Sequence, residues 1–334
     1  MTDLLTSSEV TATPGSDEVA GFVELTGDQL RTELVDFAEG EDRASIKQFP
    51  NWGDAADLIE IMDVRSVGDG RYIGAARGDW RRPVVEASQM LGQAVVAAMR
   101  HAAGRRAVSA SMVFVRGADA RLPLVFVLEA LSAGRTFTAL TARVEQLDRV
   151  IASGTILLDV TAPDMIRHTV SAPDIAGPSA CPSHDMGVTG RDLRIVDGAY
   201  TGDPAAPIGP PTLDAWVRFR DVPDDPALND GLLTQFTGHL SIAAALRPHA
   251  GVGEQQAHVS LSMGINAISI SFHRDVRADR WMLYHHLSTA ATDGMTHSEC
   301  RVHDEDGGLL ASFTVDAMLR AFGGSGTGDY RSSM

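Results

Sequence analysis

The most constraining feature of this sequence is a series of motifs that occurs twice. Residues 114–128, FVRGADARLPLVFVL, correspond to residues 272–286, FHRDVRADRWMLYHH. An AAMR or AALR motif precedes each of these segments, and a VIAS or LLAS motif follows it. Each motif is short, but their shared order at similar separations indicates an internal duplication. We therefore expect two structurally related units in one chain.

Each unit contains a helical segment followed by strands. Residues 84–104 and 228–251 are apolar on nearly all sides, which predicts a buried helix in each half. A hairpin is predicted at residues 57–77, before the first helix. Strand patterns follow each helix, at residues 107–116, 123–134, 136–146 and 149–160 and at residues 257–274, 280–290, 295–307 and 309–320. One buried helix followed by antiparallel strands is an α+β pattern.

Shifts in composition along the chain predict five segments. Residues 163–212 concentrate Pro, Gly, Ser and Ala, which predicts a connection without regular structure. Residues 27–40 have helical spacing and predict an accessory helix. The five segments are a flexible N-terminus (1–56), a first domain (57–162), a linker (163–212), a second domain (213–325) and a flexible tail (326–334).

The charge and the cysteine content restrict the partners and the location. A formal net charge of −16 argues against nucleic acid or an anionic membrane surface as the main partner. No apolar run approaches the length of a membrane span, and the first residues lack the basic and apolar regions of a secretory signal. Cys181 and Cys300 have no zinc-type spacing, and the sequence has no Gly-rich phosphate loop. We therefore expect a cytoplasmic protein without a metal or cofactor.

Three segments carry a resemblance to a known family. They are RPVVEASQMLGQAVVAA at 82–98, FHRDVRADRWMLYHHLSTA at 272–290 and DEDGGLLASFTVDAMLR at 304–320. The first segment covers the start of the first buried helix, the second is a signature in the second half, and the third is the last hairpin. In all three, the chain resembles the bacterial acyl-CoA thioesterase II family. The resemblance implies a double hotdog fold, in which two tandem repeats each wrap an antiparallel sheet around a buried helix. It also implies hydrolysis of the thioester of fatty acyl-CoA.

The chain departs from that family at its usual catalytic positions. The resemblance implies that an Asp on the second-half helix, a Thr on the next strand and a Gln on the last strand hold the attacking water. An ungapped comparison places Gly238, Ile265 and Val315 at these three positions. None of these side chains can bind a water molecule. The catalytic set is therefore either lost or rebuilt nearby.

A polar residue follows each of the three departures and suggests a rebuilt set. His239 could serve as general base near neutral pH, Asn266 could orient the water or donate to the oxyanion, and Asp316 could orient the histidine. Strand alternation puts Asn266 on the core-facing side and Asp316 on a polar face, and a one-residue bulge would reverse these assignments. The competing interpretation is that His239 is a core histidine and Asp316 a surface residue.

Other residues are candidates for binding the substrate. Arg274 could meet the phosphates of coenzyme A, although such arginines more often form surface ion pairs. Gln89 matches the helix glutamine of the family. Its alternative role is to support packing without contacting the substrate. Glu86 precedes the first buried helix, where capping is favoured over a role as base. His285 and His286 are adjacent and point to opposite strand faces, which argues against a shared metal site.

Together these observations predict an acyl-CoA thioesterase-like hydrolase with non-standard catalytic residues. A catalytically inactive protein that binds acyl-CoA, or regulates through it, is the alternative, and thiol release from acyl-CoA separates the two. Enoyl hydration is a third possibility, but no hydratase motif supports it. We expect acyl-CoA as the partner and further assembly into a homo-oligomer.

Overall fold

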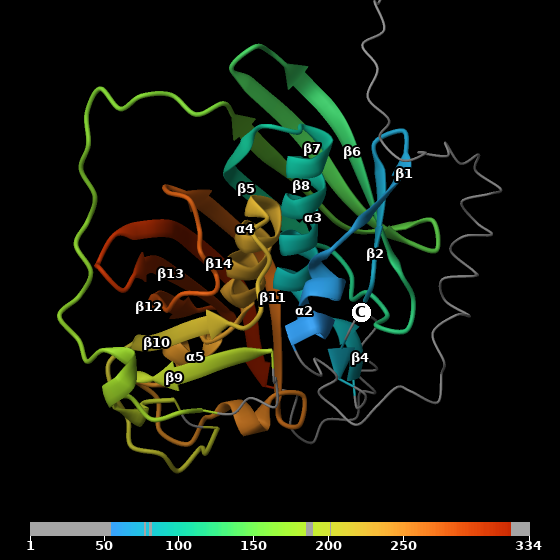
Figure 1. Ribbon diagram of the computed structural model, residues 1–334. Helices are drawn as coiled ribbons and strands as arrows, with labels where there is room; N and C mark the ends of the chain where they lie inside the picture. Colours follow the sequence, from blue (N-terminus) through green and yellow to red (C-terminus); the bar gives the residue numbers. More distant parts are fainter. Residues whose placement is uncertain (1–54, 77, 80–81, 185–189, 201, 322–334) are drawn as a thin grey trace, which may run out of the picture.

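The computed structural model describes residues 55–76, 78–79, 82–184, 190–200 and 202–321 (Figure 1). The predicted accessory helix at 27–40 and the predicted tail at 326–334 lie outside the described residues.

Within its described residues, the first half of the chain forms two helices and eight strands. The predicted first helix is α3, whose Ala-rich sequence favours a helix and whose residues from Ser88 to Met99 are all buried. The elements in chain order are α2 Ala55–Met62, β1 Arg65–Gly68, β2 Arg71–Gly74, β3 Gly78–Asp79, β4 Arg82–Val85, α3 Ala87–His101, β5 Arg106–Phe114, β6 Leu124–Ala133, β7 Phe137–Gln146 and β8 Arg149–Asp159.

The second half repeats this arrangement with a shorter and interrupted helical segment. Short helical turns, labelled η, punctuate its connections. The elements are η2 Pro178–Ala180, β9 Arg191–Ile195, η3 Val196–Gly198, β10 Thr212–Phe219, α4 Pro226–Gln235, η4 Phe236–Gly238, α5 Ser241–Leu246, η5 Glu254–Gln256, β11 Leu261–Phe272, β12 Met282–Thr292, β13 Met295–Asp304 and β14 Leu309–Ala321.

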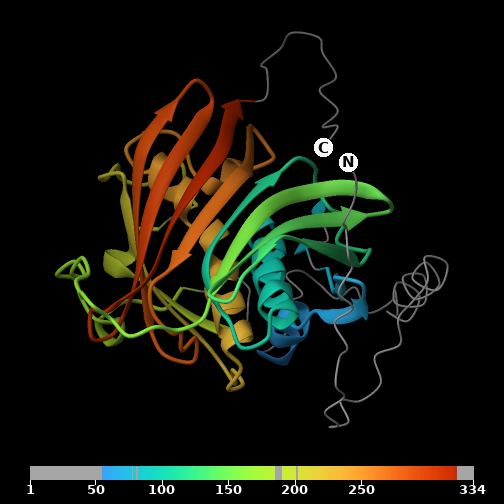
Figure 2. The same ribbon diagram turned by 90° about the horizontal axis from the view of Figure 1, so that it is seen from above.

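The two halves share one antiparallel sheet of 12 strands, in the order β1-β2-β6-β7-β8-β5-β11-β14-β13-β12-β10-β9. The halves join where β5 pairs with β11, with Ser111 opposite Ser269 and their hydroxyl oxygens 2.7 Å apart. Seen from above, the strands curve around α3 and α4 (Figure 2). Two helices wrapped by one duplicated sheet confirm the predicted double hotdog fold.

The central helices α3 and α4 run antiparallel and touch closely. A Cβ atom added at Gly92 would lie 2.7 Å from the carbonyl oxygen of Gly231, so any residue larger than glycine would displace the backbone at this crossing. Arg100 near the end of α3 reaches Asp225 before α4, with 3.4 Å between guanidinium and carboxylate. The start of α3 therefore meets the end of α4, and this meeting point lies between the two halves.

Two local predictions were wrong. Residues 57–62 belong to α2 and not to a hairpin strand, because Leu58, Ile61 and Met62 recur at helical spacing and are all buried. The hairpin itself is β1 and β2. Within the predicted linker at 163–212, residues 191–195 form β9, which pairs with β10 at the edge of the sheet.

The second-half helix was predicted to be continuous but is broken after η4. His239 is extended, with φ −92° and ψ 151°, and Leu240 is left-handed, with φ 65°. The hydroxyls of Thr234 and Thr237 bond backbone carbonyls within the same segment, at 2.7 Å each. Such bonds and the glycine at 238 weaken a helix, which is consistent with a break at this point.

Candidate active site

One titratable pair bridges the two halves at the meeting point of α3 and α4. Nε2 of His239, in the helix break, lies 3.7 Å from Oε1 of Glu86, which immediately precedes α3. The histidine side chain is 10% exposed and the glutamate side chain 40% exposed. The imidazole is therefore enclosed, whereas the carboxylate is partly open to solvent.

Glu86 occupies the position of a helix cap without acting as one. Its backbone is extended, with φ −63° and ψ 137°, and its side chain makes no capping bond to α3. The favoured prediction of a capping role was therefore wrong. Its carboxylate instead accepts a hydrogen bond from Nε2 of Gln235, at 3.2 Å, at the end of α4.

A buried arginine stands behind this pair. Arg191 on β9 is 5% exposed and donates from Nη1 to Oε1 of Gln235 at 3.2 Å. Its guanidinium also lies over the ring of Phe236, 4.8 Å from the centroid. The Phe236 ring in turn stacks on His239, with centroids 4.7 Å apart and planes 3° from parallel. Arg191 is thus linked to both members of the pair.

Burial and this arginine set the ionisation of the pair. Burial raises the pKa of Glu86 above its ordinary value, while the charge of Arg191 and the bond from Gln235 partly oppose the increase. Burial lowers the pKa of His239 well below its ordinary value, and Arg191 and His286 lower it further. The environment thus favours a neutral imidazole beside a carboxyl group with increased proton affinity.

Several buried polar atoms around the pair have no hydrogen-bonding partner among the described residues. Native proteins ordinarily satisfy such atoms, often with ordered water or bound ligand. The cluster can therefore hold a water molecule or a substrate oxygen. The atoms are Oγ of Ser88, Nη2 of Arg191, Nδ1 of His239, Oγ of Ser241 and Nε2 of His286.

The position aligned with the family's aspartate lies in this cluster. A Cβ atom at Gly238 would be 2.5 Å from Oγ of Ser88 and 3.2 Å from Cδ1 of Ile265. Ser88 comes from the first half, whereas Gly238 and Ile265 belong to the second. A hydroxyl from the other half therefore occupies the space into which a side chain at 238 would extend.

Asn266 and Asp316 do not join His239 in one group. A bulge between Ile265 and Ala267 turns Asn266 outward, so it is exposed and its predicted core-facing orientation was wrong. Asp316 lies half exposed and bonds Nδ1 of His297 at 2.6 Å, on the polar face predicted for it. Glu86 and not Asp316 is the carboxylate beside His239.

The candidate substrate-binding residues lie in different parts of the molecule. Arg274 follows the end of β11, 3.7 Å from the carboxylate of Asp304, and about 23 Å of strand separates Phe272 from Ile265. Gln89 is fully buried and donates to the carbonyl of Ala75 at 3.2 Å. Of these three candidates, only Glu86 lies beside His239.

The adjacent histidines on β12 have separate environments, as predicted. His285 is partly exposed and lies 2.6 Å from the carboxylate of Asp214. His286 is fully buried, and its ring contacts those of Tyr284 and Phe313. The two side chains therefore lie on opposite faces of the strand.

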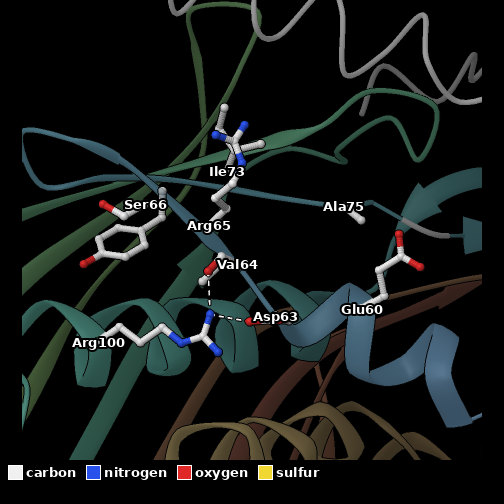
Figure 3. A pocket seen from close by; sticks show the side chains of 9 residues that line it. Glu60, Asp63, Val64, Arg65, Ser66, Ile73, Ala75 and Arg100 are labelled. Carbon is white, nitrogen blue, oxygen red and sulfur yellow. Dashed lines mark hydrogen bonds and ion pairs between the residues drawn. The ribbon is translucent and has the colours of Figure 1, made fainter. Parts of the chain in front are cut away.

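A hollow of about 650 Å³ lies elsewhere, between α2, the β1–β2 hairpin and the end of α3 (Figure 3). Arg100 lines it and is engaged by Asp63 and the carbonyl of Val64. Arg100 follows Glu86 by four helical turns, about 21 Å along the axis. Neither Glu86 nor His239 lines this hollow, so it is distinct from their pair.

Comparison with protein families identifies the chain. The model described as "Acyl-CoA thioesterase C-terminal domain" matches residues 171–318, and the "Acyl-CoA thioesterase N-terminal domain" matches residues 76–158. The chain belongs to the acyl-CoA thioesterase family. It is an acyl-CoA thioesterase-like hydrolase, as the sequence resemblance predicted, and the alternative of a catalytically inactive binding protein is not favoured.

Individual relatives are similar over most of the chain. Acyl-CoA thioesterase 2 of Haemophilus influenzae is 23% identical over 79% of this chain and 97% of its own length. Two solved structures share the fold at a TM-score of 0.68 and cover 80% of this chain: a tesB protein of Mycobacterium avium and the acyl-CoA thioesterase II TesB2 of Mycobacterium marinum. They are 20% and 24% identical and are covered over 100% and 99% of their lengths.

Sequence reasoning missed two residues of this thioesterase's candidate site. Arg191 lies in the segment taken for a linker, although the alternation of Arg191, Leu193 and Ile195 with polar neighbours was a usable strand signal. Gln235 lies in the second-half helix, where its contacts across the chain, with Glu86 and Arg191, set it apart. In the described residues, no helix is long and apolar enough to span a membrane.

Proposed function

We propose that this chain hydrolyses acyl-CoA thioesters with a water molecule held at the Glu86–His239 pair. The observation that carries the proposal is the pairing itself. A carboxylate from one half and an imidazole from the other meet 3.7 Å apart, amid buried polar atoms without partners among the described residues. The names of the relatives support acyl-CoA as the substrate class.

Glu86 suits the role of general base better than His239. A base must be unprotonated at working pH and still have a substantial proton affinity. Arg191 and Gln235 stabilise the carboxylate of Glu86, while burial increases its proton affinity. His239 has a pKa decreased by burial and by Arg191, so its neutral ring can hold the water but accepts a proton poorly. This assignment changes the role of His239 from base to water-binding partner.

The chemistry then balances with no covalent enzyme intermediate. Glu86 takes a proton from the water, and the water oxygen bonds to the thioester carbonyl carbon. The tetrahedral oxyanion forms beside the first turn of α3, where backbone N–H groups lack intrahelical partners and the helix dipole favours negative charge. The carbon–sulfur bond breaks, and the proton on Glu86 passes to the thiolate of coenzyme A.

Thiol release from short, medium and long acyl-CoAs tests the function. The proposal predicts release by the purified full chain from at least one chain length. It would be abandoned if no acyl-CoA gave thiol while acyl-CoA still bound.

Two variants at one position test the role of His239. His239→Ala removes the water contact and lowers kcat, whereas His239→Gln keeps a hydrogen-bonding group and retains more activity. Equal and severe losses in both variants would return the role of base to His239.

We also propose a cytoplasmic homo-oligomer. Two buried free cysteines suit a reducing compartment. Exposed apolar side chains on and beside the sheet, including Val113, Leu131 and Phe137, suit contact with another copy. Light scattering on the full chain tests the assembly.

A further inference from the structure

Arg191 is a buried cation that forms no direct ion pair with a carboxylate of the described residues. Among the described residues, none places a carboxylate within ion-pair distance of it, and its Nη2 is buried without an acceptor. Burial lowers its pKa to about 10, so it stays charged at neutral pH. An enclosed charge of this kind is costly to a fold, which calls for a functional reason.

The contacts of Arg191 lead to both members of the Glu86–His239 pair. One route is polar: Arg191 donates to Gln235 at 3.2 Å, and Gln235 donates to Glu86 at 3.2 Å. The other route is by stacking: the guanidinium covers Phe236, which is parallel to the ring of His239. Glu86 belongs to the first half, so Arg191 on β9 also fastens the two halves together at this point.

We infer that Arg191 is the positioning residue of the site, holding Glu86 through Gln235 and His239 through Phe236. This inference rests on the proposed function. Arg191 does not contact the reacting atoms in this scheme. It fixes the distance between carboxylate and imidazole, and its positive charge acts on both groups.

The positive charge of Arg191 shifts the pKa values of Glu86 and His239 in the same direction. The charge of Arg191 lowers the pKa of Glu86 and that of His239. Loss of this charge therefore raises both values. If Glu86 is the base, the pH below which activity falls must then increase, and a residue that merely packed in the core would leave that pH unchanged.

Arg191→Met, Arg191→Lys and Arg194→Met provide the test, with the pH dependence of kcat/KM as the readout. Arg194 is the matched control, because it lies on the same strand with its guanidinium over Trp281. In Arg191→Met we expect the acid limb to rise by about one pH unit, since a nearby charge shifts a pKa by about 1–3 units. In Arg191→Lys the charge is kept, so we expect the acid limb of kcat/KM near its wild-type pH. We expect a decreased kcat, because lysine cannot bond Gln235 and stack on Phe236 as arginine does. Arg194→Met should match the wild type.

Unchanged acid limbs in both Arg191 variants, with kcat near wild type, would overturn the inference. If Arg191→Met does not fold, Gln235→Leu replaces it: this variant breaks the polar route and removes the bond that lowers the pKa of Glu86, so kcat should fall and the acid limb should rise. Wild-type kcat in Gln235→Leu together with wild-type behaviour of Arg191→Lys would also overturn the inference.

A readout without turnover separates this inference from the proposed function. The imidazole of His239, assigned by comparison with His239→Gln, can be titrated by NMR in the wild type and in a folded Arg191 variant. Its pKa should be higher in Arg191→Met and nearly unchanged in Arg191→Lys. If the wild type releases no thiol but this pattern holds, the proposed function fails and the positioning role stands. If thiol is released and the His239 titration is insensitive to Arg191, the positioning role fails alone.

Discussion

The helix of the first half and the helical segment of the second differ in continuity. Helix α3 runs unbroken over Ala87–His101, whereas its counterpart ends at Gln235 and resumes as α5 at Ser241. Between them Leu240 is buried with φ 65°, a conformation that costs about 1–3 kcal/mol for a residue with a side chain. The break places His239 beside Glu86. The first copy of the duplicated unit thus keeps a regular helix. In the second copy, a strained backbone conformation lowers stability but brings the side chain of His239 to the site.

The residues immediately before the two helices show the same contrast. Asp225 before α4 caps it, accepting from the backbone N–H of Ala227 at 2.9 Å. Glu86 before α3 makes no capping bond and faces Gln235 and His239 instead. The two acidic residues at equivalent helix starts therefore have different roles: Asp225 caps its helix, and Glu86 belongs to the candidate site. Substitutions at the two positions should therefore have different effects.

The largest effect is expected from Glu86→Gln. This change keeps the size of the side chain but removes the base, so kcat should fall about 10²–10⁴-fold with acyl-CoA binding retained. The fold raises the pKa of Glu86, so the protonated form is the one it favours, and ionisation above the ordinary value of 4.5 weakens the fold. A permanently neutral glutamine should therefore leave the melting temperature at neutral pH equal or higher. Near-wild-type kcat in Glu86→Gln would remove Glu86 from the mechanism.

The next effect concerns the crossing of the two helices. In Gly92→Ala the added Cβ would lie 2.7 Å from a backbone carbonyl oxygen of α4, which cannot rotate away. Overpacking costs about 1–3 kcal/mol, and alanine recovers about 1 kcal/mol of helix propensity. We therefore expect a net loss of up to about 2 kcal/mol in the free energy of unfolding, measured by urea denaturation. Gly264→Ala is the control, because nothing lies within 4 Å of its added Cβ. Equal stability of both variants would mean that the helices can separate without cost.

The sequence predicted the regular first-half helix correctly but not the interruption of its second-half counterpart. The duplication, the strands and the unbroken α3 follow from motif order and hydrophobic pattern. The helix break could not be predicted in this way, because residues 228–251 keep an apolar pattern through Gly238, His239 and Leu240. Gly238 and the hydroxyls of Thr234 and Thr237 weaken the helix locally, but the hydrophobic pattern does not record the break.

The candidate site was predicted only in part for a related reason. His239 and Glu86 were both named, but in separate roles, since their contact joins residues from different halves. Asn266 was misplaced by one bulge, which reverses every face assignment beyond it. Arg191 was hidden in a short edge strand that follows a long irregular connection. Local periodicity predicts elements well, whereas contacts between repeats require the folded chain.

A pH profile gives the third prediction. Glu86 must be ionised to accept a proton, and its pKa is raised above the ordinary 4.5. Activity should therefore be lost as the pH falls through this raised pKa, so the acid limb of kcat/KM should lie above 4.5. His239 has its pKa well below 6.5, so the wild type should show no separate decrease centred near 6.5. A single limb near 6.5 that disappears in His239→Gln would instead mark His239 as the titrating base.

The smallest effect is expected at the structural counterpart of Glu86. Asp225→Ala removes the cap of α4, which typically costs about 1 kcal/mol of stability. Asp225 also faces Arg100 at 3.4 Å, but this pair is partly exposed and adds little. The cap lies at the opposite end of α4 from Gln235, so kcat at a temperature where the variant stays folded should equal that of the wild type. Thermal unfolding and thiol release measured on the same sample check both parts. A fall in kcat comparable to that of Glu86→Gln would show that the two helix starts are coupled, and the division of duties between the halves would then be wrong.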